Sequence, residues 1–129
     1  MTRLMLICLG GAAGSGARYL TALWAAAAFG PAFPFGTLIV NVAGSFLIGV
    51  VQALAERAAL LPEPARLFLS AGVMGGFTTY SAFSYETVRL LELDAVGRAV
   101  VNVVTTTLVC VGVCALGIAA GRYIVSWRG

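Results

Sequence analysis

Long stretches without any charged residue constrain this sequence more than any other feature. They cover residues 4–17, 19–55, 67–85 and 99–121. A helix that crosses a bilayer needs roughly 20 mostly apolar residues. Soluble domains are about a quarter charged, whereas this chain of 129 residues is 60% hydrophobic and only 10% charged. Most of its side chains must therefore be surrounded by membrane lipid or by other membrane helices.

Three breaks divide the apolar sequence. Residues 30–36 contain two prolines flanked by glycines, a combination that ends a helix. Residues 61–64 contain two further prolines, and residues 92–94 are mostly acidic. The sequence therefore predicts an all-α integral membrane protein, with residues 1–129 forming a single transmembrane domain. Its four helices are expected at about 3–28, 36–58, 65–91 and 96–126.

The arginines are scattered along the chain and form no basic face. A nucleic-acid partner is therefore not expected, although the net charge is +3. Four spans would divide the arginines into two groups, one on each side of the membrane. The first group is Arg3, Arg57, Arg66, Arg122 and Arg128, and the second is Arg18, Arg89 and Arg98. This division is a weak bias under the positive-inside rule, and it predicts that the chain inserts in both orientations.

Polar side chains at membrane depth must face a partner or a water-filled path. The second expected helix carries Thr37, Asn41 and Ser45 at intervals of four, which places them on one stripe. Hydroxyl groups also hydrogen-bond between membrane helices, so Thr37 and Ser45 are equally well explained as helix contacts. Asn41 is costlier to bury and offers two N–H donors, which favours a functional role.

The third expected helix contains an internal weak point. Adjacent glycines are followed by two threonines within residues 75–79, and freed backbone groups there are tolerated only inside protein or beside a cavity. Broken membrane helices often mark ion sites. The hydroxyls of Ser81 and Ser84 follow, together with the rings of Tyr80 and Phe83, which lie three residues apart. The sequence therefore predicts a helix broken in mid-membrane beside a polar path.

The chemistry of this path suits an anion. The fourth helix adds Thr106, on a stripe with Asn102 and Cys110. Amide N–H groups, hydroxyl protons and the positive edges of aromatic rings can replace part of an anion's hydration shell. A cation path would instead show rings of carboxylates or carbonyls. Glu86 is the one acid in this set. It is interpreted either as the ion-pair partner of Arg89, one turn further on, or as a functional residue.

Two pairs of glycines are best explained by helix packing. Gly10 and Gly14 form a GxxxG pair in the first helix, and Gly117 and Gly121 form one in the fourth. Such pairs let helix backbones approach closely in membranes. They predict close helix packing.

Residues 10–19, 35–49 and 75–86 carry three motifs, and together these resemble the CrcB/Fluc family of fluoride channels. Residues 10–19 (GGAAGSGARY) resemble the family's GGxxGAxxR opening. Residues 35–49 (FGTLIVNVAGSFLIG) resemble its GTLxVNxxGxFxxG second helix. Residues 75–86 (GGFTTYSAFSYE) resemble its GGxTTFSTFSxE break. The three matches occur in the family's order along the chain.

The resemblance implies a passive fluoride channel, not an enzyme, that exports fluoride from the cytoplasm and lowers its toxicity. It implies an antiparallel, dual-topology homodimer with two pores, spanning the cell inner (plasma) membrane several times. It also implies a structural sodium ion at the dimer interface, held by backbone carbonyls of Gly75 and Thr78, and an arginine, Arg18, near the vestibule. With the hydroxyls of the polar path included, the predicted pore residues are Asn41, Tyr80, Phe83, Ser81, Ser84 and Thr106.

The chain departs from the family's pattern at three positions. Tyr80 stands where phenylalanine is usual, Ala82 replaces a threonine, and Asn102 falls where a tyrosine is expected.

The alternative function is a small multidrug-resistance-type, proton-coupled exporter of cationic compounds. That mechanism needs an acid in the first helix, which here carries Arg18. A structural membrane subunit without transport is a third interpretation, and it leaves the hydroxyl cluster of residues 78–84 unexplained.

Overall fold

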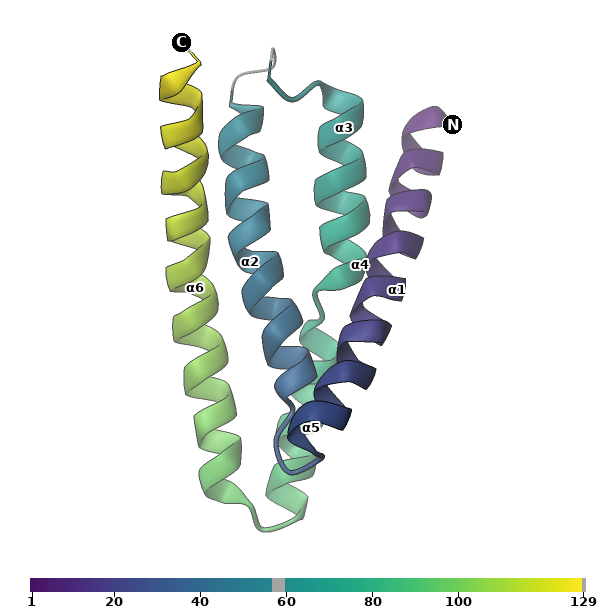
Figure 1. Ribbon diagram of the computed structural model, residues 1–129. Coiled ribbons are helices and arrows are strands. Elements are labelled where there is room, and N and C mark those ends of the chain that lie inside the picture. Colours follow the sequence, from purple (N-terminus) through teal and green to yellow (C-terminus); the bar gives the residue numbers. More distant parts are fainter. Residues whose placement is uncertain (57–59, 129) are drawn as a thin grey trace.

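The computed structural model describes residues 1–56 and 60–128. Every regular element in these ranges is helical and none is a β-strand, which confirms the predicted all-α class (Figure 1). The elements are α1 (Thr2–Phe29), α2 (Phe35–Ala55), α3 (Glu63–Leu67), the π-helix η1 (Phe68–Met74), α4 (Gly75–Phe77), α5 (Tyr80–Glu92) and α6 (Val96–Trp127). Elements α3 to α5 together occupy the place of the third predicted helix, so the fold contains the four helices expected.

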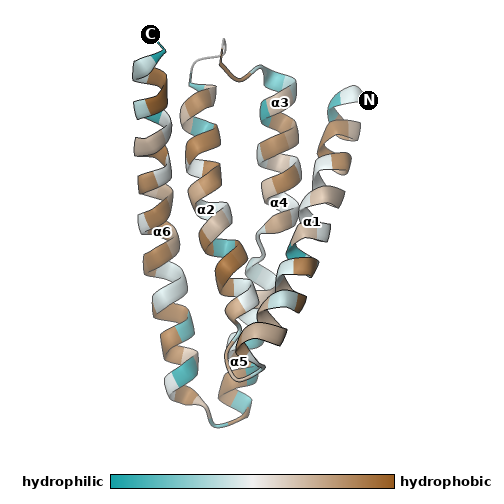
Figure 2. Ribbon diagram, in the orientation of Figure 1, coloured by the Kyte–Doolittle hydropathy of each residue, from teal (hydrophilic) through white to brown (hydrophobic). Residues whose placement is uncertain are grey.

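Two helices, α2 and α6, are long and apolar enough to cross a membrane by themselves. The third predicted span is divided into short segments, so none of its parts passes the same test of length. Membrane crossing by α1 and by the α3–α5 region stays a prediction. Large apolar side chains nevertheless cover much of the outer surface, among them Leu9, Leu20, Leu108 and Leu116. Apolar residues run along all of the long helices in Figure 2, as expected for contact with lipid.

The helix ends follow the glycine and proline signals. Gly30 ends α1 with a φ of 76°, a left-handed conformation that glycine adopts without strain, and its N–H donates to the Ala26 carbonyl at 3.0 Å. Pro34 directly precedes α2, and Pro64 lies in the first turn of α3. The expected end of the second helix at residue 58 lies outside the described residues, as does Arg57.

Glycines bring α1 against the segment before the break. A Cβ added at Gly10 would lie 2.9 Å from the Cα of Gly72, and one added at Gly76 would lie 3.0 Å from the Ser15 nitrogen. A Cβ at Gly14 would collide with the backbone at Val73. The two backbones therefore touch without side chains between them. The predicted close packing at this glycine pair is confirmed.

A second glycine contact joins α2 to α6. A Cβ on Gly117 would meet the Phe46 backbone, and one on Gly121 would lie 3.0 Å from the Val50 carbonyl oxygen. Gly49 faces α6 in the same way, next to the backbone at Ile118. The close packing predicted for the glycine pair of the fourth helix is also confirmed.

The two ends of the molecule differ in what they bring together. Both termini and the C-terminal end of α2 lie at one end, and the α1–α2 and α5–α6 connections lie at the other (Figure 1). At the first end Arg3 pairs with Glu63 at 3.1 Å, and Arg122 pairs with Glu56 at 3.2 Å. Both pairs are largely exposed, so each contributes at most about 1 kcal/mol.

Candidate functional site

The predicted interruption of the third helix is an extended dipeptide. Thr78 has φ −82° and ψ 155°, and Thr79 has φ −153° and ψ 112°. The preceding turn closes with the Thr78 N–H donating to the Met74 carbonyl at 3.0 Å. Thr79 then caps the N-terminus of α5, where its Oγ1 accepts the Ala82 N–H at 3.2 Å. A π-helix leads into this break, and π-helical turns are frequent at functional sites.

Asn41 holds the break through both ends of its side-chain amide. Its Nδ2 donates to the Thr79 carbonyl at 3.0 Å, and its Oδ1 accepts the Thr79 N–H at 2.8 Å. These two bonds satisfy a backbone that has left helical geometry and would otherwise lack partners. One of the two N–H donors of Asn41 is therefore committed to Thr79, and the other makes no hydrogen bond within residues 1–56 and 60–128.

This arrangement leaves specific carbonyls of the break free. The Gly75 carbonyl would accept from the Thr79 N–H in a continuous helix, and that donor is used by Asn41. The Thr78 carbonyl would accept from the Ala82 N–H, and that donor is used by the Thr79 hydroxyl. Within the described ranges no hydrogen bond reaches either oxygen. The two carbonyls predicted to hold sodium are therefore both available as ligands.

Arg18 satisfies a third carbonyl of the break. Its Nε donates to the Gly76 oxygen at 3.0 Å, from α1 to α4. In a continuous helix this oxygen would accept from the backbone N–H four residues later. The structure thus places Arg18 against the backbone of the break, beside the glycine contact of α1.

A cavity of about 510 Å³ lies beside the break and contains most of the predicted site. It brings together residues from α2, the α3–α5 region and α6, and no charged residue lines it among those described. The predicted site residues that line it are Asn41, Gly75, Thr78, Tyr80, Phe83 and Thr106. Ser81, Ser84 and Arg18 are not among the lining residues.

The two aromatic rings of the site have different surroundings. Their centroids are 5.5 Å apart with an interplanar angle of 56°. Phe83 is 8% exposed, whereas Tyr80 is 80% exposed in the single chain. A tilted pair presents ring edges as well as faces, and the edges carry the positive part of the quadrupole. Phe83 therefore forms part of the cavity wall, and Tyr80 projects from it.

The two serines of the predicted pore hydrogen-bond to residues that are close to them in the sequence. Ser84 donates its hydroxyl to the Tyr80 carbonyl at 2.9 Å. The hydroxyls of Ser81 and Thr79 lie 3.3 Å apart, and Ser81 is exposed. Both serines lie on α5 outside the cavity wall.

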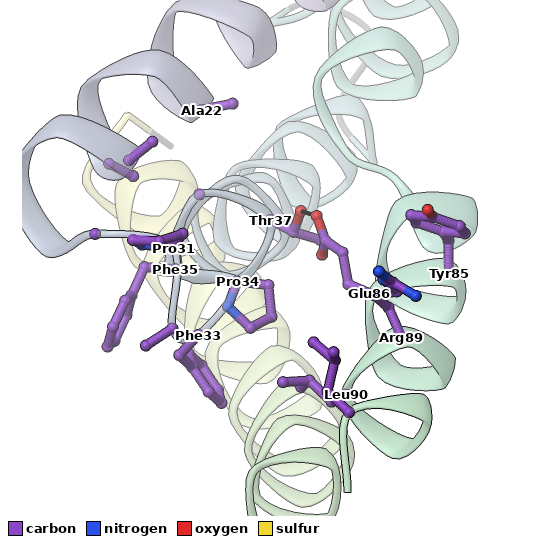
Figure 3. A pocket seen from close by; sticks show the side chains of 16 residues that line it. Ala22, Pro31, Phe33, Pro34, Phe35, Thr37, Tyr85, Glu86, Arg89 and Leu90 are labelled. Carbon is purple, nitrogen blue, oxygen red and sulfur yellow. Dashed lines mark hydrogen bonds between the residues drawn. The ribbon is translucent and has the colours of Figure 1, made fainter. Parts of the chain in front are cut away.

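A smaller cavity of about 270 Å³ lies near the α1–α2 connection. Figure 3 shows Thr37 and Glu86 pointing toward one another across it, from α2 and from α5. Thr37 donates to Glu86 Oε1 at 2.8 Å, and Glu86 Oε2 is buried without a hydrogen-bond partner in the described chain. The interpretation of Glu86 as the ion-pair partner of Arg89 is wrong, because Arg89 pairs with Glu92 at 2.9 Å. Packing of α2 against α5 provides the partner that local spacing could not predict.

Sequence reasoning gave no role to two threonines that the structure places in contact with the site. Thr79 is the partner of Asn41, and Thr87 accepts a hydrogen bond from Asn102 Nδ2 at 2.9 Å. Threonine is a common N-cap residue and here follows the glycines of the break, so Thr79 carried a signal in the sequence. Thr87 carried none, because a hydroxyl in mid-helix is usually bonded to its own backbone.

Comparison with known proteins gives a consistent result. The family described as "CrcB-like protein, Camphor Resistance (CrcB)" matches residues 5–118. A protein of Anaeromyxobacter dehalogenans named "Fluoride-specific ion channel FluC" is 56% identical over 110 residues, covering 85% of this chain and 87% of that protein. Proteins with the same name from Sorangium cellulosum and Geobacter metallireducens are 46% identical over 126 residues and 47% identical over 124 residues. These two matches cover 98% and 96% of this chain, and 99% and 100% of the relatives.

Proposed function

Because this chain belongs to the CrcB family, we propose that it is a passive, fluoride-selective ion channel. The observation that carries this function is its similarity to proteins named fluoride-specific ion channels, which extends over nearly their whole length. The proposed activity is passage of an ion with no chemical step. Flow is outward when fluoride accumulates in the cytoplasm, which lowers its toxicity to the cell.

The larger cavity supports an anion path. Its described lining has no charged side chain, and it includes an amide, hydroxyls and two aromatic rings. The free N–H of Asn41 and the edge of the Phe83 ring are the groups we assign to the ion, whereas Thr106 lines the path with its hydroxyl proton donated to Asn102 Oδ1. A small anion that loses water can be stabilised by such donors without being trapped by a fixed positive charge. Ser81 and Ser84 are proposed to continue this path along α5.

Arg18 is proposed to contribute positive potential near the vestibule. Among the residues that the structure describes, it is the one charged group bonded directly to the backbone of the break, through the Gly76 carbonyl. A partly buried guanidinium attracts anions over several ångströms. The proton-coupled exporter of cationic compounds is not supported, because α1 carries this arginine and no acid.

We propose that the working unit is an antiparallel homodimer in the cell inner membrane, with both orientations inserted. Tyr80 is 80% exposed beside a cavity whose wall also contains buried residues such as Phe83. Free backbone carbonyls cannot face lipid, so a second copy of the chain must cover the side of the break. A twofold axis would pair this surface with itself.

A structural sodium ion fits the free carbonyls of this dimer. Gly75 and Thr78 each contribute one oxygen per copy, so two copies would supply four neutral oxygens. Neutral carbonyls suit a singly charged ion better than calcium, which takes six to eight oxygens and usually includes carboxylates. When bound, the ion would supply a positive charge for the carbonyl oxygens to coordinate, and it would hold the two copies together.

The direct test is fluoride efflux from liposomes that contain only the purified protein, followed with a fluoride electrode. Chloride-loaded liposomes and protein-free liposomes serve as controls. We expect rapid, passive fluoride efflux and little chloride efflux. Fluoride efflux no faster than in protein-free liposomes, from protein shown to be folded and inserted, would contradict the function.

A further inference from the structure

A buried chain of polar groups links α6 to the carbonyl of Phe83. Asn102 on α6 is 1% exposed. Burying an amide is unfavourable unless its polar atoms are hydrogen-bonded. Its Nδ2 donates to Thr87 Oγ1 at 2.9 Å, and its Oδ1 accepts from Thr106 Oγ1 at 3.4 Å. Both polar atoms of this amide are therefore engaged, one toward α5 and one toward a residue of the cavity wall.

Thr87 links Asn102 to Phe83, the buried aromatic residue of the site. It lies one turn after Phe83 on α5, and its hydroxyl donates to the Phe83 carbonyl at 2.7 Å. A hydroxyl has one proton to donate, so the proton goes to Phe83 and the lone pair accepts from Asn102. The direction of every bond is thus determined, from Asn102 through Thr87 to the backbone of Phe83.

The break leaves the position of α5 dependent on side-chain contacts of this kind, among them the bond from Thr37 to Glu86. Helix α5 is not continuous with α4, so helical hydrogen bonds do not fix its rotation or depth. Asn41 anchors its first turn through Thr79, and Asn102 anchors it two turns later through Thr87. Phe83 lies between these two anchors and forms part of the cavity wall.

We propose that Asn102 is a positioning residue for the ion path. Acting through Thr87, it sets the rotation and depth of α5 and so places the Phe83 ring in the cavity. The proposal rests on the proposed function, because its main consequence is a change in fluoride passage. It gives a role to the position where this chain has asparagine in place of the expected tyrosine.

The test measures fluoride flux per folded dimer in liposomes for Thr87→Val, Thr87→Ser and Asn102→Leu. Valine keeps the shape of threonine and removes the hydroxyl, whereas serine keeps the hydroxyl. We expect Thr87→Val and Asn102→Leu each to lower flux about tenfold, which corresponds to the loss of roughly one buried hydrogen bond. The double variant should lose no more flux than either single variant, because both residues act through the same connection. Thr87→Ser should retain at least about half of the flux.

Thr21→Val is the matched control. Thr21 on α1 makes the same kind of bond, from its hydroxyl to the Ala17 carbonyl four residues earlier at 2.9 Å, and it lines neither of the two cavities described above. Its flux should equal that of the unaltered protein. Normal flux in Thr87→Val, or equal losses in the valine and serine variants, would overturn the proposal.

A second measurement does not depend on transport. 4-Fluorophenylalanine incorporated at Phe83 gives a ¹⁹F resonance that reports on the surroundings of the ring. We expect Thr87→Val and Asn102→Leu to shift or broaden this resonance, and Thr21→Val to leave it unchanged. An unchanged resonance in all variants would overturn the positioning role. Absence of fluoride flux in the unaltered protein, with the resonance still sensitive to Asn102, would instead count against the proposed function.

Discussion

Asn41 makes two hydrogen bonds to the backbone of a single residue, and an aspartate could keep only one of them. Asn41→Asp retains the acceptor for the Thr79 N–H but places a second carboxylate oxygen against the Thr79 carbonyl. It also brings a negative charge to an uncharged anion path, which costs several kcal/mol. We expect fluoride flux to fall at least about a hundredfold in the liposome assay.

Dimer content and thermal stability, measured on the same Asn41→Asp preparations, separate loss of conduction from loss of folding. A variant that is folded, dimeric and normally conducting would show that Asn41 does not face the ion.

The ring pair gives a second prediction at this scale. Phe83→Ile keeps apolar bulk and removes the positive ring edge, so it should block fluoride flux. Tyr80→Phe keeps the ring and removes only the hydroxyl, so flux should remain within about twofold of the unaltered protein. Both variants are compared by efflux per folded dimer. Loss of flux in both would mean that the Tyr80 hydroxyl is itself essential.

At the scale of elements, glycines determine how closely α1 approaches the segment before the break. Gly14→Ala would drive a methyl group into the backbone at Val73. We expect it to lower the free energy of unfolding by roughly 1–3 kcal/mol, the usual cost of overpacking. Thermal unfolding in detergent measures the effect.

Gly16→Ala is the control for this change, because it lies on the same helix and its added Cβ would meet nothing within 4 Å. Alanine also favours helix over glycine, so this variant should be neutral or slightly stabilised. Equal destabilisation of the two variants would argue against a specific backbone contact at Gly14.

The element-level structure was largely predictable because its signals are local. Glycines and prolines mark the end of α1 and the start of α2, and the glycine–threonine run marks the break. The pairing of Asn41 with Thr79 spans 38 residues, and no local rule specifies which backbone group an amide will find. The same reason explains why the ion pair of Glu86 with Arg89, one of two open interpretations, is wrong, because packing of α2 supplied Thr37 as the partner.

The site was predictable in part for a related reason. Resemblance to family motifs identified the residues around the larger cavity, including Asn41 and Phe83. It could not show that Asn41 is bonded to the break, nor that Asn102 reaches α5 through Thr87. Those contacts depend on how whole helices rotate against each other. The roles of the individual site residues remain predictions.

At the scale of the whole molecule, the division of arginines between the two ends predicts dual topology. Arg57 lies outside the described residues, and the expectation therefore rests on the sequence for that position. Reporter fusions at the C-terminus, one active only in the cytoplasm and one only outside it, should both give signal. The control is the same reporters fused to a membrane protein that inserts in a single orientation. A single orientation combined with a functional parallel dimer would contradict the prediction.

The proposed sodium site also belongs to the whole molecule, because it needs two copies of the chain. Replacing sodium by a large organic cation at constant ionic strength should lower both dimer stability and fluoride flux, because the Gly75 and Thr78 carbonyls would lose the ion that they coordinate. Restoring sodium should reverse both effects. Equal stability and flux in the two salts would count against the site and favour water as the partner of these carbonyls.

The two glycine contacts described above also govern which sequence changes the protein can tolerate. One joins α1 to the segment before the break, and the other joins α2 to α6. In both, backbone touches backbone, so even a single added methyl group is excluded. The lipid-facing sides of the same helices can exchange one apolar residue for another at little cost. A saturation mutagenesis screen under fluoride stress should therefore find two narrow lines of intolerant positions running along otherwise permissive helices.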